Sequence, residues 1–327
     1  MILVGDIGGT KTNLAFFNKE GNILRSVREK VYLSKQYASL GEIIKQFIRE
    51  SAQTIDEAAF GIAGPVVNGR CEATNLPWVV DAREITSEFG VRTVHLLNDL
   101  EATAYGALHL QGDDTLQLNV GVAQRCGAIA VIAAGTGLGE AGLVWNPTKR
   151  DYQTLPSEGG HTDFAPRSEL EMNLLRFLLT KYKRVSYERV VSGMGIVNLY
   201  QFFRTQVDYP EPQWLVSEFS NGDTAATISN AAMAGKDEAC IKAMELFVSL
   251  YAAESGNLAL KLLSTGGVFI GGGIAPKILP MLQQSTFMDS FTNKGRFSHL
   301  MKNMPVSVVL NEKAALLGAA HYALLSQ

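Results

Sequence analysis

The chain has 327 residues, of which 46% are hydrophobic, and its formal net charge at pH 7 is -3. This length favours two domains, and the hydrophobic content excludes a disordered chain. The nearly balanced charge, without any dense Lys/Arg run, argues against nucleic acid as a partner, and no apolar run approaches the length of a membrane span. We therefore expect a globular enzyme or binding protein that acts away from membranes.

The three cysteines, Cys71, Cys126 and Cys240, are far apart in the sequence and lack CxxC spacing. Scattered cysteines in odd number are typical of reduced thiols rather than of a disulfide framework or a metal site. Nothing at the amino terminus resembles a targeting signal, because the apolar residues 1–4 are followed at once by Gly5-Asp6. We expect a cytoplasmic protein.

In chain order, the first half alternates apolar runs with glycine-rich turns, which predicts an α/β unit. We expect strands at residues 2–4, 14–17, 23–31, 58–62 and 94–97, and helices at 40–51 and 99–110. The first strand ends in a turn with the sequence Gly5-Asp6-Ile7-Gly8-Gly9-Thr10.

The second half repeats the opening theme of strand, glycine turn and strand. Strands at 128–133 and 143–145 flank the turn Gly135-Thr136-Gly137-Leu138-Gly139, which predicts a duplicated architecture. The remainder is expected to be largely helical, with strands at 268–270 and 306–310. Expected helices include one capped by Ser168 and Glu171, a long one from 237 to about 263, and a last one from 312 capped by Asn311.

The two glycine turns approximate known phosphate motifs without matching them. Residues 5–12 nearly spell a P-loop, but Thr10 replaces its second glycine and a strand follows where a helix is required. Residues 137–142 fit G-x-G-x-x-G, yet a strand and turn stand where a dinucleotide-binding fold would begin its crossover helix. Either turn alone would be an ordinary hairpin. Together they favour a nucleotide, with Thr10 and Thr136 as hydroxyl donors and Asp6 holding Mg²⁺ through water.

Six segments, taken together, resemble one family. Residues 6–10, 97–99 and 135–137 resemble the phosphate and catalytic motifs of the actin-like/hexokinase superfamily. Residues 157–161, 187–193 and 267–274 narrow the resemblance to bacterial glucokinases, and the motifs occur in the family's order over almost the whole chain. The resemblance implies an α/β, two-domain actin-like (ribonuclease H-like) hexokinase fold, also called the ASKHA fold, with an interdomain cleft.

The resemblance also implies the domain division and the activity. The small α/β domain would comprise residues 1–109 plus 311–327, and the large α/β domain residues 110–310. The enzyme would be a glucokinase of glycolysis and carbohydrate metabolism, a homodimer that uses ATP and Mg²⁺ to convert glucose to glucose 6-phosphate. The related repressor/kinase group has a cysteine-rich zinc motif after the histidine and a DNA-binding segment before the first motif. This sequence lacks both, so we expect neither zinc nor transcriptional repression.

The resemblance assigns roles to individual residues. Asp99 would be the general base that takes the proton of the sugar's primary hydroxyl, although Asp is also favoured as the N-cap of a following helix. The sugar would be bound by Asn98, Asp99, Glu158, His161, Glu188 and Asn75. The nucleotide would be bound by Gly5, Asp6, Ile7, Gly8, Gly9, Thr10, Gly135, Thr136, Gly137, Gly271 and Gly272. Trp78, near Asn75, is expected in the core rather than over the sugar.

Three alternatives remain open from the sequence. A kinase for another hexose, such as mannose or an N-acetylhexosamine, is the first alternative, and kcat/KM across a panel of hexoses would separate it from a glucokinase. A non-catalytic sugar-sensing protein on the same fold is a second alternative. An actin-like ATPase that forms filaments is a third, disfavoured because Glu158, His161 and Glu188 would then have no ligand.

Overall fold

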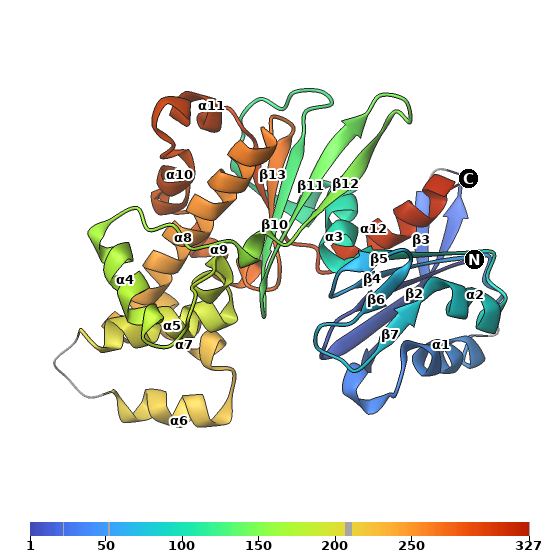
Figure 1. Cartoon of the computed structure of the whole chain (residues 1–327), viewed down its shortest axis with the longest axis horizontal. Coiled ribbons are helices and arrows are strands. Elements are labelled where there is room, and N and C mark those ends of the chain that lie inside the picture. The colour runs from blue at the N-terminus through green and yellow to red at the C-terminus, as the bar shows by residue number, and fades with distance from the viewer. Residues whose placement is uncertain (22, 52, 207–210, 327) are drawn as a thin grey trace. The chain divides into compact units, whose positions relative to one another are not determined.

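The computed structural model describes residues 1–21, 23–51, 53–206 and 211–326 (Figure 1). The chain divides into two units. The first comprises Met1–Asp114, Thr154–Pro156 and Asn311–Gln327, and the second Thr115–Gln153 and Ser157–Leu310. The boundary expected after residue 109 lies inside the first unit, which continues through the 3-10 turn η2 (Gly112–Asp114).

A five-stranded mixed sheet forms the framework of the first unit, in the order β3-β2-β1-β4-β8. Strands β1, β2 and β3 pair in antiparallel fashion, and β4 and β8 continue the sheet in parallel with β1. A second, three-stranded sheet contains β5, β6 and β7. The bounds are β1 (Ile2–Ile7), β2 (Lys11–Glu20), β3 (Ile23–Leu33), β4 (Glu57–Ile62), β5 (Val66–Val67), β6 (Arg70–Glu72), β7 (Val79–Asp81) and β8 (Thr93–Asn98).

Alternate residues of β1 face two different cores, as the two-residue period of a strand requires. Leu3 and Ile7 belong to a core that includes residues of α1 (Leu40–Arg49) and α2 (Ala82–Phe89). Ile2 and Val4 belong to a core formed with α3 (Asp99–Ala107) and α12 (Ala314–Ala323). Trp78 is buried in the first of these cores, as expected for a packing residue.

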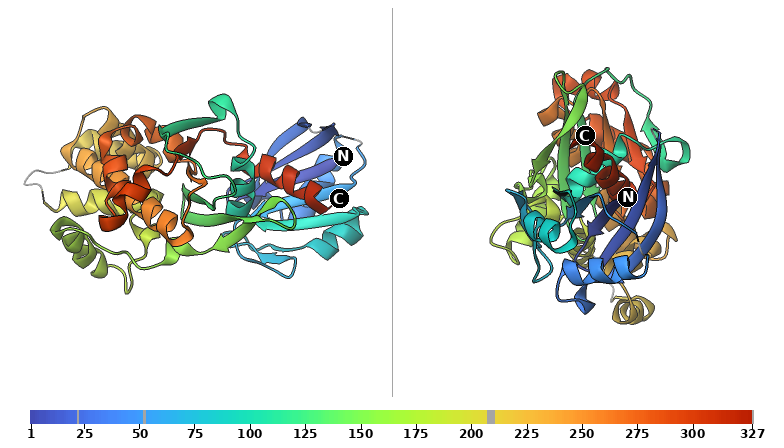
Figure 2. Two further views of the ribbon diagram at one scale, coloured as in Figure 1. Left: turned by 90° about the horizontal axis from the view of Figure 1, so that it is seen from above. Right: turned by 90° about the vertical axis from the view of Figure 1, so that its right-hand side faces the viewer.

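Helices α3 and α12 lie side by side in the first unit (Figures 1 and 2). A Cβ on Gly106 would lie 1.9 Å from the carbonyl oxygen of Ala314, and one on Gly318 would lie 1.8 Å from that of Ala102. These glycines are therefore required by the close approach of the two helices. The last helix begins two residues later than expected, because Asn311 accepts a hydrogen bond from the backbone N–H of Lys313 and forms a turn before it.

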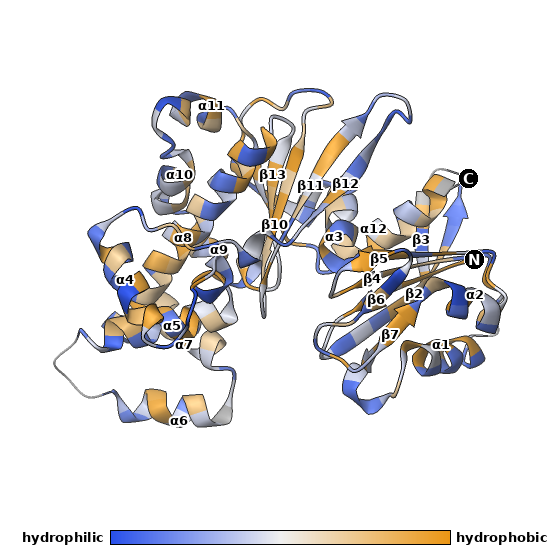
Figure 3. Ribbon diagram, in the orientation of Figure 1, coloured by the Kyte–Doolittle hydropathy of each residue, from blue (hydrophilic) through white to orange (hydrophobic). Residues whose placement is uncertain are grey.

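A six-stranded mixed sheet, in the order β12-β11-β10-β13-β14-β9, forms the framework of the second unit. Its central hairpin is antiparallel, and the next two strands continue in parallel with β10, as β4 and β8 do with β1. The predicted duplication of architecture is thus present in the strand order. The bounds are β9 (Thr115–Asn119), β10 (Ile129–Ala134), β11 (Leu138–Asn146), β12 (Asp151–Ser157), β13 (Gly267–Gly271) and β14 (Val306–Val309). Figure 3 shows the contrast between the hydrophobic interior strand β13 and the mostly hydrophilic edge strand β12.

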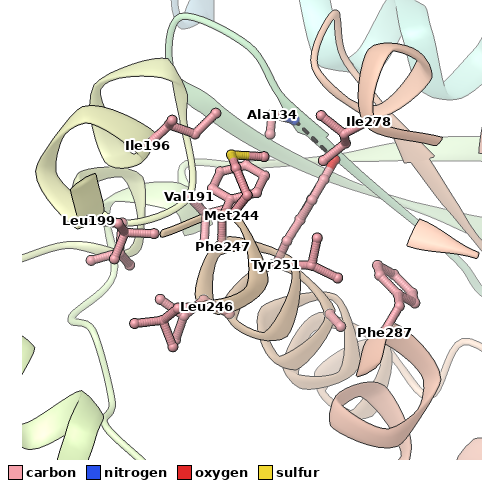
Figure 4. Packing of buried hydrophobic residues seen from close by; sticks show 14 of the residues in the cluster. Ala134, Val191, Ile196, Leu199, Met244, Leu246, Phe247, Tyr251, Ile278 and Phe287 are labelled. Carbon is pink, nitrogen blue, oxygen red and sulfur yellow. Dashed lines mark hydrogen bonds between the residues drawn. The ribbon is translucent and has the colours of Figure 1, made fainter. Parts of the chain in front are cut away.

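The helices of the second unit enclose its main core. Buried residues line α8 along most of its length, and the side chains of Phe247 and Tyr251 are fully enclosed (Figure 4). Ser168 caps α4, as predicted, and Asp237 caps α8, the long helix expected from residue 237. No helix in the described ranges has the length and apolar character needed to cross a membrane. The bounds are α4 (Glu169–Leu179), α5 (Gly193–Arg204), α6 (Gln213–Asn221), α7 (Thr224–Met233), α8 (Glu238–Leu262), α9 (Leu279–Leu282), α10 (Ser285–Thr292) and α11 (Ser298–Lys302).

A strand follows each of the two glycine turns, as predicted. Strand β2 begins at Lys11, directly after the first turn. Strand β11 begins at Leu138, five residues earlier than expected, because the β10–β11 hairpin closes tightly through a hydrogen bond from Gly135 N–H to Gly137 O. Neither turn opens the helix that a P-loop or a dinucleotide motif needs.

Candidate active site

Three parallel strands of the first unit end at the same edge of its sheet. In the sheet register, Ile7 of β1 pairs with Ile62 of β4, and Ile62 pairs with Asn98 of β8. Asp6 and Asp99 therefore lie at one edge, separated by two strand spacings of about 4.8 Å each. This carboxyl edge is where α/β proteins bind their ligands.

The first glycine turn contacts the loop that carries Asn75. A Cβ on Gly9 would lie 2.5 Å from the Cβ of Asn75, so this close approach requires a glycine. The backbone N–H of Thr74 donates to Ala63 O at 3.0 Å, which attaches the same loop to the end of β4. The structure thus brings the turn of residues 5–10 and Asn75 together, with the side chains of Thr10 and Asn75 exposed.

Asn98, rather than Asp99, caps helix α3. Asn98 Oδ1 accepts from the backbone N–H of Leu100 at 2.9 Å, and its Nδ2 donates to Gly64 O at 3.1 Å. Asp99 is the first residue of the helix, and its Oδ1 also accepts from Leu100 N–H at 2.9 Å. The N-cap role that was the alternative for Asp99 therefore belongs mainly to Asn98. Asn98 is the residue directly before the first helical residue.

The carboxyl group of Asp6 provides a suitable ligand for a divalent cation. It is half-buried beside the first glycine turn, and burial raises its pKa to about 6. Within the described part of the chain, no basic group offsets this cost of burial. A cation bound there would favour the ionised form, and Mg²⁺ commonly uses one carboxylate together with water and phosphate oxygens.

Glu188 is held against the second glycine turn. It lies in the 3-10 turn η4 (Tyr187–Arg189), and its Oε2 accepts from the backbone N–H of Leu138 at 3.1 Å. A Cβ on Gly137 would lie 2.5 Å from the same oxygen, so the contact leaves no space for a larger residue. A glutamate in an isolated sequence motif is usually a solvated helix charge, whereas this one is attached to a hairpin.

Glu158 and His161 flank the other side of the same hairpin. They border the 3-10 turn η3 (Gly159–His161), and both side chains are exposed. A Cβ on Gly160 would lie 2.0 Å from the carbonyl oxygen of Leu138. The peptide groups of Leu138 therefore contact both turns, and the structure brings Glu158, His161 and Glu188 together within the second unit.

A cavity of about 1070 Å³ opens beside the second glycine turn, within the second unit. Gly135 and Thr136 lie on one side, and the first residues of α5 and α7 and the segment after β13 form the others. This volume is at the upper end for a small-molecule site. Its apolar lining includes Met194, Ile196, Val197, Met233, Ile274 and Ile278.

The glycines at the end of β13 also have packing roles that local sequence patterns do not predict. Gly273 lines the cavity. Gly272 has φ of 82°, and a Cβ there would lie 2.3 Å from the carbonyl oxygen of Ala134. Its lack of a side chain serves the packing of β13 on β10. Tyr251 supports the same junction, because its hydroxyl accepts from Ala134 N–H at 3.1 Å and donates to Gly271 O at 2.9 Å (Figure 4).

The cavity residues of α5 and α7 were not predicted from the sequence. Local signals for these helix starts exist, because Ser192 caps α5 and Asp223 caps α7. Both helices present their amino-terminal residues to the cavity, where backbone N–H groups favour an anion. A cap predicts where a helix begins, but not that two helix starts share one cavity.

Comparison with known proteins identifies the family. The glucokinase family model matches residues 3–326. The chain belongs to the glucokinase family. The glucokinase of Nostoc punctiforme is 42% identical over 335 residues, which cover 98% of each protein. The predicted family and the predicted glucokinase activity, that of an ATP-dependent hexose kinase, are thereby confirmed.

Solved structures support the same assignment. The crystal structure of a glucokinase from an Antarctic psychrotroph is 31% identical, with a TM-score of 0.86 over 99% of this chain and 98% of that one. A ROK family glucokinase from Streptomyces griseus, solved with glucose and AMPPNP, is 20% identical, with a TM-score of 0.66 over 99% of both chains. At this low identity, the second similarity supports the fold alone. The fold is the two-domain sugar-kinase fold with mixed sheets.

Proposed function

We propose that this chain transfers the γ-phosphate of ATP to the 6-hydroxyl of glucose, giving glucose 6-phosphate and ADP. The arrangement around Leu138 supports this most directly. Its N–H binds Glu188 and its carbonyl contacts Gly160, so the sugar-binding candidates lie against a glycine turn suited to phosphate. Phosphoryl transfer requires this proximity of acceptor and phosphate, since positioning supplies much of the catalysis.

We propose further that the two units form an actin-like core with an interdomain cleft. The matching strand order of the two sheets supports this, because each unit then contributes one glycine hairpin. The first unit would contribute Asp6, Asn75, Asn98 and Asp99, and the second Glu158, His161 and Glu188. Closure over the sugar would exclude water, which would otherwise compete as the acceptor of the phosphate.

Asp99 would act as the general base. Its position at the carboxyl edge of the sheet, directly after the last residue of β8, supports the role. The base takes the proton of the 6-hydroxyl as the oxygen forms its bond to phosphorus. A positioned base of this kind contributes roughly 10²–10⁴-fold to the rate.

The cavity of the second unit would hold the adenosine, with the phosphates on the turn of Gly135 and Thr136. Its apolar lining suits a base and ribose, while glycine backbone N–H groups and the Thr136 hydroxyl suit phosphate oxygens. Mg²⁺, held near Asp6, would neutralise phosphate charge. Gly5, Ile7, Gly8, Gly9 and Thr10 would provide the second set of phosphate contacts.

Sugar specificity would come from charge-assisted hydrogen bonds. Glu158, Glu188 and His161 offer such bonds, and the amide of Asn98 has a second hydrogen besides the one that bonds Gly64. A hexose that lacks one hydroxyl would leave a carboxylate unpaired, at a cost of about 1–3 kcal/mol.

We also propose that the protein is cytoplasmic and that it forms a homodimer. The homodimer is inferred from family resemblance alone. The three cysteines are free thiols, with Cys71 and Cys240 buried, as suits a reducing compartment. Sedimentation equilibrium of the purified chain tests the dimer directly, since a single species at monomer mass would contradict it.

A coupled kinase assay with ATP, Mg²⁺ and a hexose panel tests the proposed function. We expect the highest kcat/KM with glucose. A higher value with mannose or an N-acetylhexosamine would reassign the substrate. If no sugar in the panel leads to ADP formation, the non-catalytic sugar-sensing protein would be favoured instead.

A further inference from the structure

A glutamate is buried in the middle of β11, directly beneath the turn that carries Glu158 and His161. The Glu140 side chain is 1% exposed, and its Oε1 receives no hydrogen bond from any described residue. A Cβ on Gly159 would lie 1.9 Å from Glu140 Oε2, so the carboxyl group lies against the backbone of that turn. Such a carboxylate would be costly to bury in ionised form.

A second buried glutamate lies next to it. Glu254, on α8, has no exposed surface, and its charge is one of the causes that raise the pKa of Glu140. Glu254 has donors of its own. Asn257 Nδ2 donates to its Oε2 at 2.8 Å and to the Tyr187 hydroxyl at 3.1 Å, and Lys261 Nζ lies 3.5 Å from its Oε1.

These contacts decide which carboxyl group holds the proton. Two ionised carboxylates cannot hydrogen-bond each other, because both are acceptors. Two donors stabilise the negative charge of Glu254, whereas no donor among the described residues reaches Glu140 Oε1. The shared proton therefore belongs to Glu140, and Glu140 donates it to Glu254.

The pair is connected to both turns of the sugar-binding group. Glu140 lies against Gly159 of η3, while Asn257 Nδ2 donates both to Glu254 and to the hydroxyl of Tyr187, the residue before Glu188 in η4. We propose that Glu140, as a neutral carboxylic acid bonded to Glu254, is a positioning residue that holds these two turns in the geometry that binds the sugar. The inference rests on the proposed sugar-binding role of Glu158, His161 and Glu188.

This assignment predicts a pH dependence of sugar binding. Burial and the neighbouring charge of Glu254 raise the pKa of Glu140 to about 8. Above that pH the two carboxylates would repel each other, and the turns would lose their common support. The other charged or titratable groups around the pair are Lys261 on α8, Tyr187 on η4, Arg167 ahead of α4 and Lys294 after α10.

Among these groups, Lys294 titrates in the same range. Burial, and then the charge of Arg167, lower its pKa to about 8, and its Nζ donates to Ala253 O and Asn257 Oδ1. For Tyr187, burial and then the Glu254 charge raise the pKa, which takes it further from this window. A test must therefore separate Glu140 from Lys294.

The experiment measures the KM for glucose and for ATP against pH in wild type, Glu140→Gln, Glu140→Ala and Lys294→Met. In wild type we expect the glucose KM to rise about five-fold or more between about pH 7 and pH 9.5, with the ATP KM unaffected. Gln is neutral and still donates to Glu254, so Glu140→Gln keeps a glucose KM within about two-fold across that range. Glu140→Ala removes the donor and raises the glucose KM about ten-fold at pH 7.

Lys294→Met is expected to retain the wild-type rise. The inference is overturned by a flat glucose KM in wild type, by a rise that persists in Glu140→Gln, or by a rise that disappears in Lys294→Met. Should Glu140→Ala fail to fold, which thermal unfolding would reveal, the Gln variant still decides the question. Turnover of glucose by wild type at pH 7 tests the proposed function separately, so the two failures are distinguishable.

Discussion

Glu188 accepts a hydrogen bond at 3.1 Å from the backbone N–H of Leu138, the first residue of β11 after the second glycine turn. A carboxylate proposed for the sugar is thereby attached to a hairpin proposed for phosphate. The hydrogen bond uses Oε2, which leaves Oε1 for a ligand. One side chain can therefore hold the hairpin and bind a sugar hydroxyl.

Substitution of Glu188 separates these two roles. Glu188→Gln keeps an acceptor for Leu138 N–H but loses the charge, so we expect the glucose KM to rise roughly ten-fold while the ATP KM stays the same. Glu188→Ala loses both and is expected to raise both KM values. Glu169→Gln, in an exposed pair with Arg176, is the control and should leave the kinetics unchanged. A Glu188→Gln enzyme with the wild-type glucose KM would remove Glu188 from the sugar site.

Replacement of Asp99 by Asn tests the general base. Asn keeps an oxygen that can accept from Leu100 N–H, so α3 should begin normally. We expect kcat to fall about 10²–10⁴-fold while glucose binding, measured by calorimetry, changes little. Asp81→Asn is a matched control, because Asp81 accepts from Arg83 N–H at the start of α2. Turnover near the wild-type rate in Asp99→Asn would show that another group takes the proton.

Substitution in the cavity tests its assignment to the nucleotide. Ala226 lines the cavity, and a tryptophan there would occupy space proposed for adenosine. We expect Ala226→Trp to raise the ATP KM about ten-fold or more, with little effect on the glucose KM. Ala234→Trp, at the exposed carboxyl end of α7, is the control. An unchanged ATP KM in Ala226→Trp would place the nucleotide elsewhere.

The titration of Asp6 gives a test of the metal site that does not need catalysis. Its pKa rises from 3.8 to about 6 on burial, so the folded state favours the neutral acid. The stability this contributes is complete below the unfolded pKa and is lost as the pH rises through about 6. We expect wild type without Mg²⁺ to lose thermal stability over this range relative to Asp6→Asn, and Mg²⁺ near pH 7 to stabilise wild type alone. Parallel melting curves for the two proteins, with and without Mg²⁺, would exclude Asp6 as the ligand.

Much of the fold could be predicted from local patterns. The apolar run at residues 58–62 and the helical spacing at 40–51 predicted β4 and α1 closely, because burial on a sheet or helix face repeats every two or 3.6 residues. Ser168 predicted the start of α4 for a similar reason, since a cap acts on the next turn of its own helix. The family motifs likewise are short segments read in order.

Other features depend on contacts between distant segments. Glu140 and Glu254 are more than a hundred positions apart, and only the packing of α8 on the sheet brings them together and removes both from water. Similarly, position 272 requires a glycine because the carbonyl oxygen of Ala134 leaves no space for a Cβ. The cavity forms where the first residues of two helices and one hairpin meet. Local periodicity records whether a residue is buried, but not what it is buried against.

The sequence by itself therefore determined most strands of the two main sheets, the long helix α8, the two glycine turns and the family, since these depend on near neighbours and on motif order. Only the tertiary structure decided that Asn98 caps α3, that Glu188 binds the second hairpin and that Glu140 and Glu254 are both buried. The physical reason is that hydrogen bonding and the cost of burying a charge depend on which groups surround it. Those groups come from segments that the chain order leaves far apart.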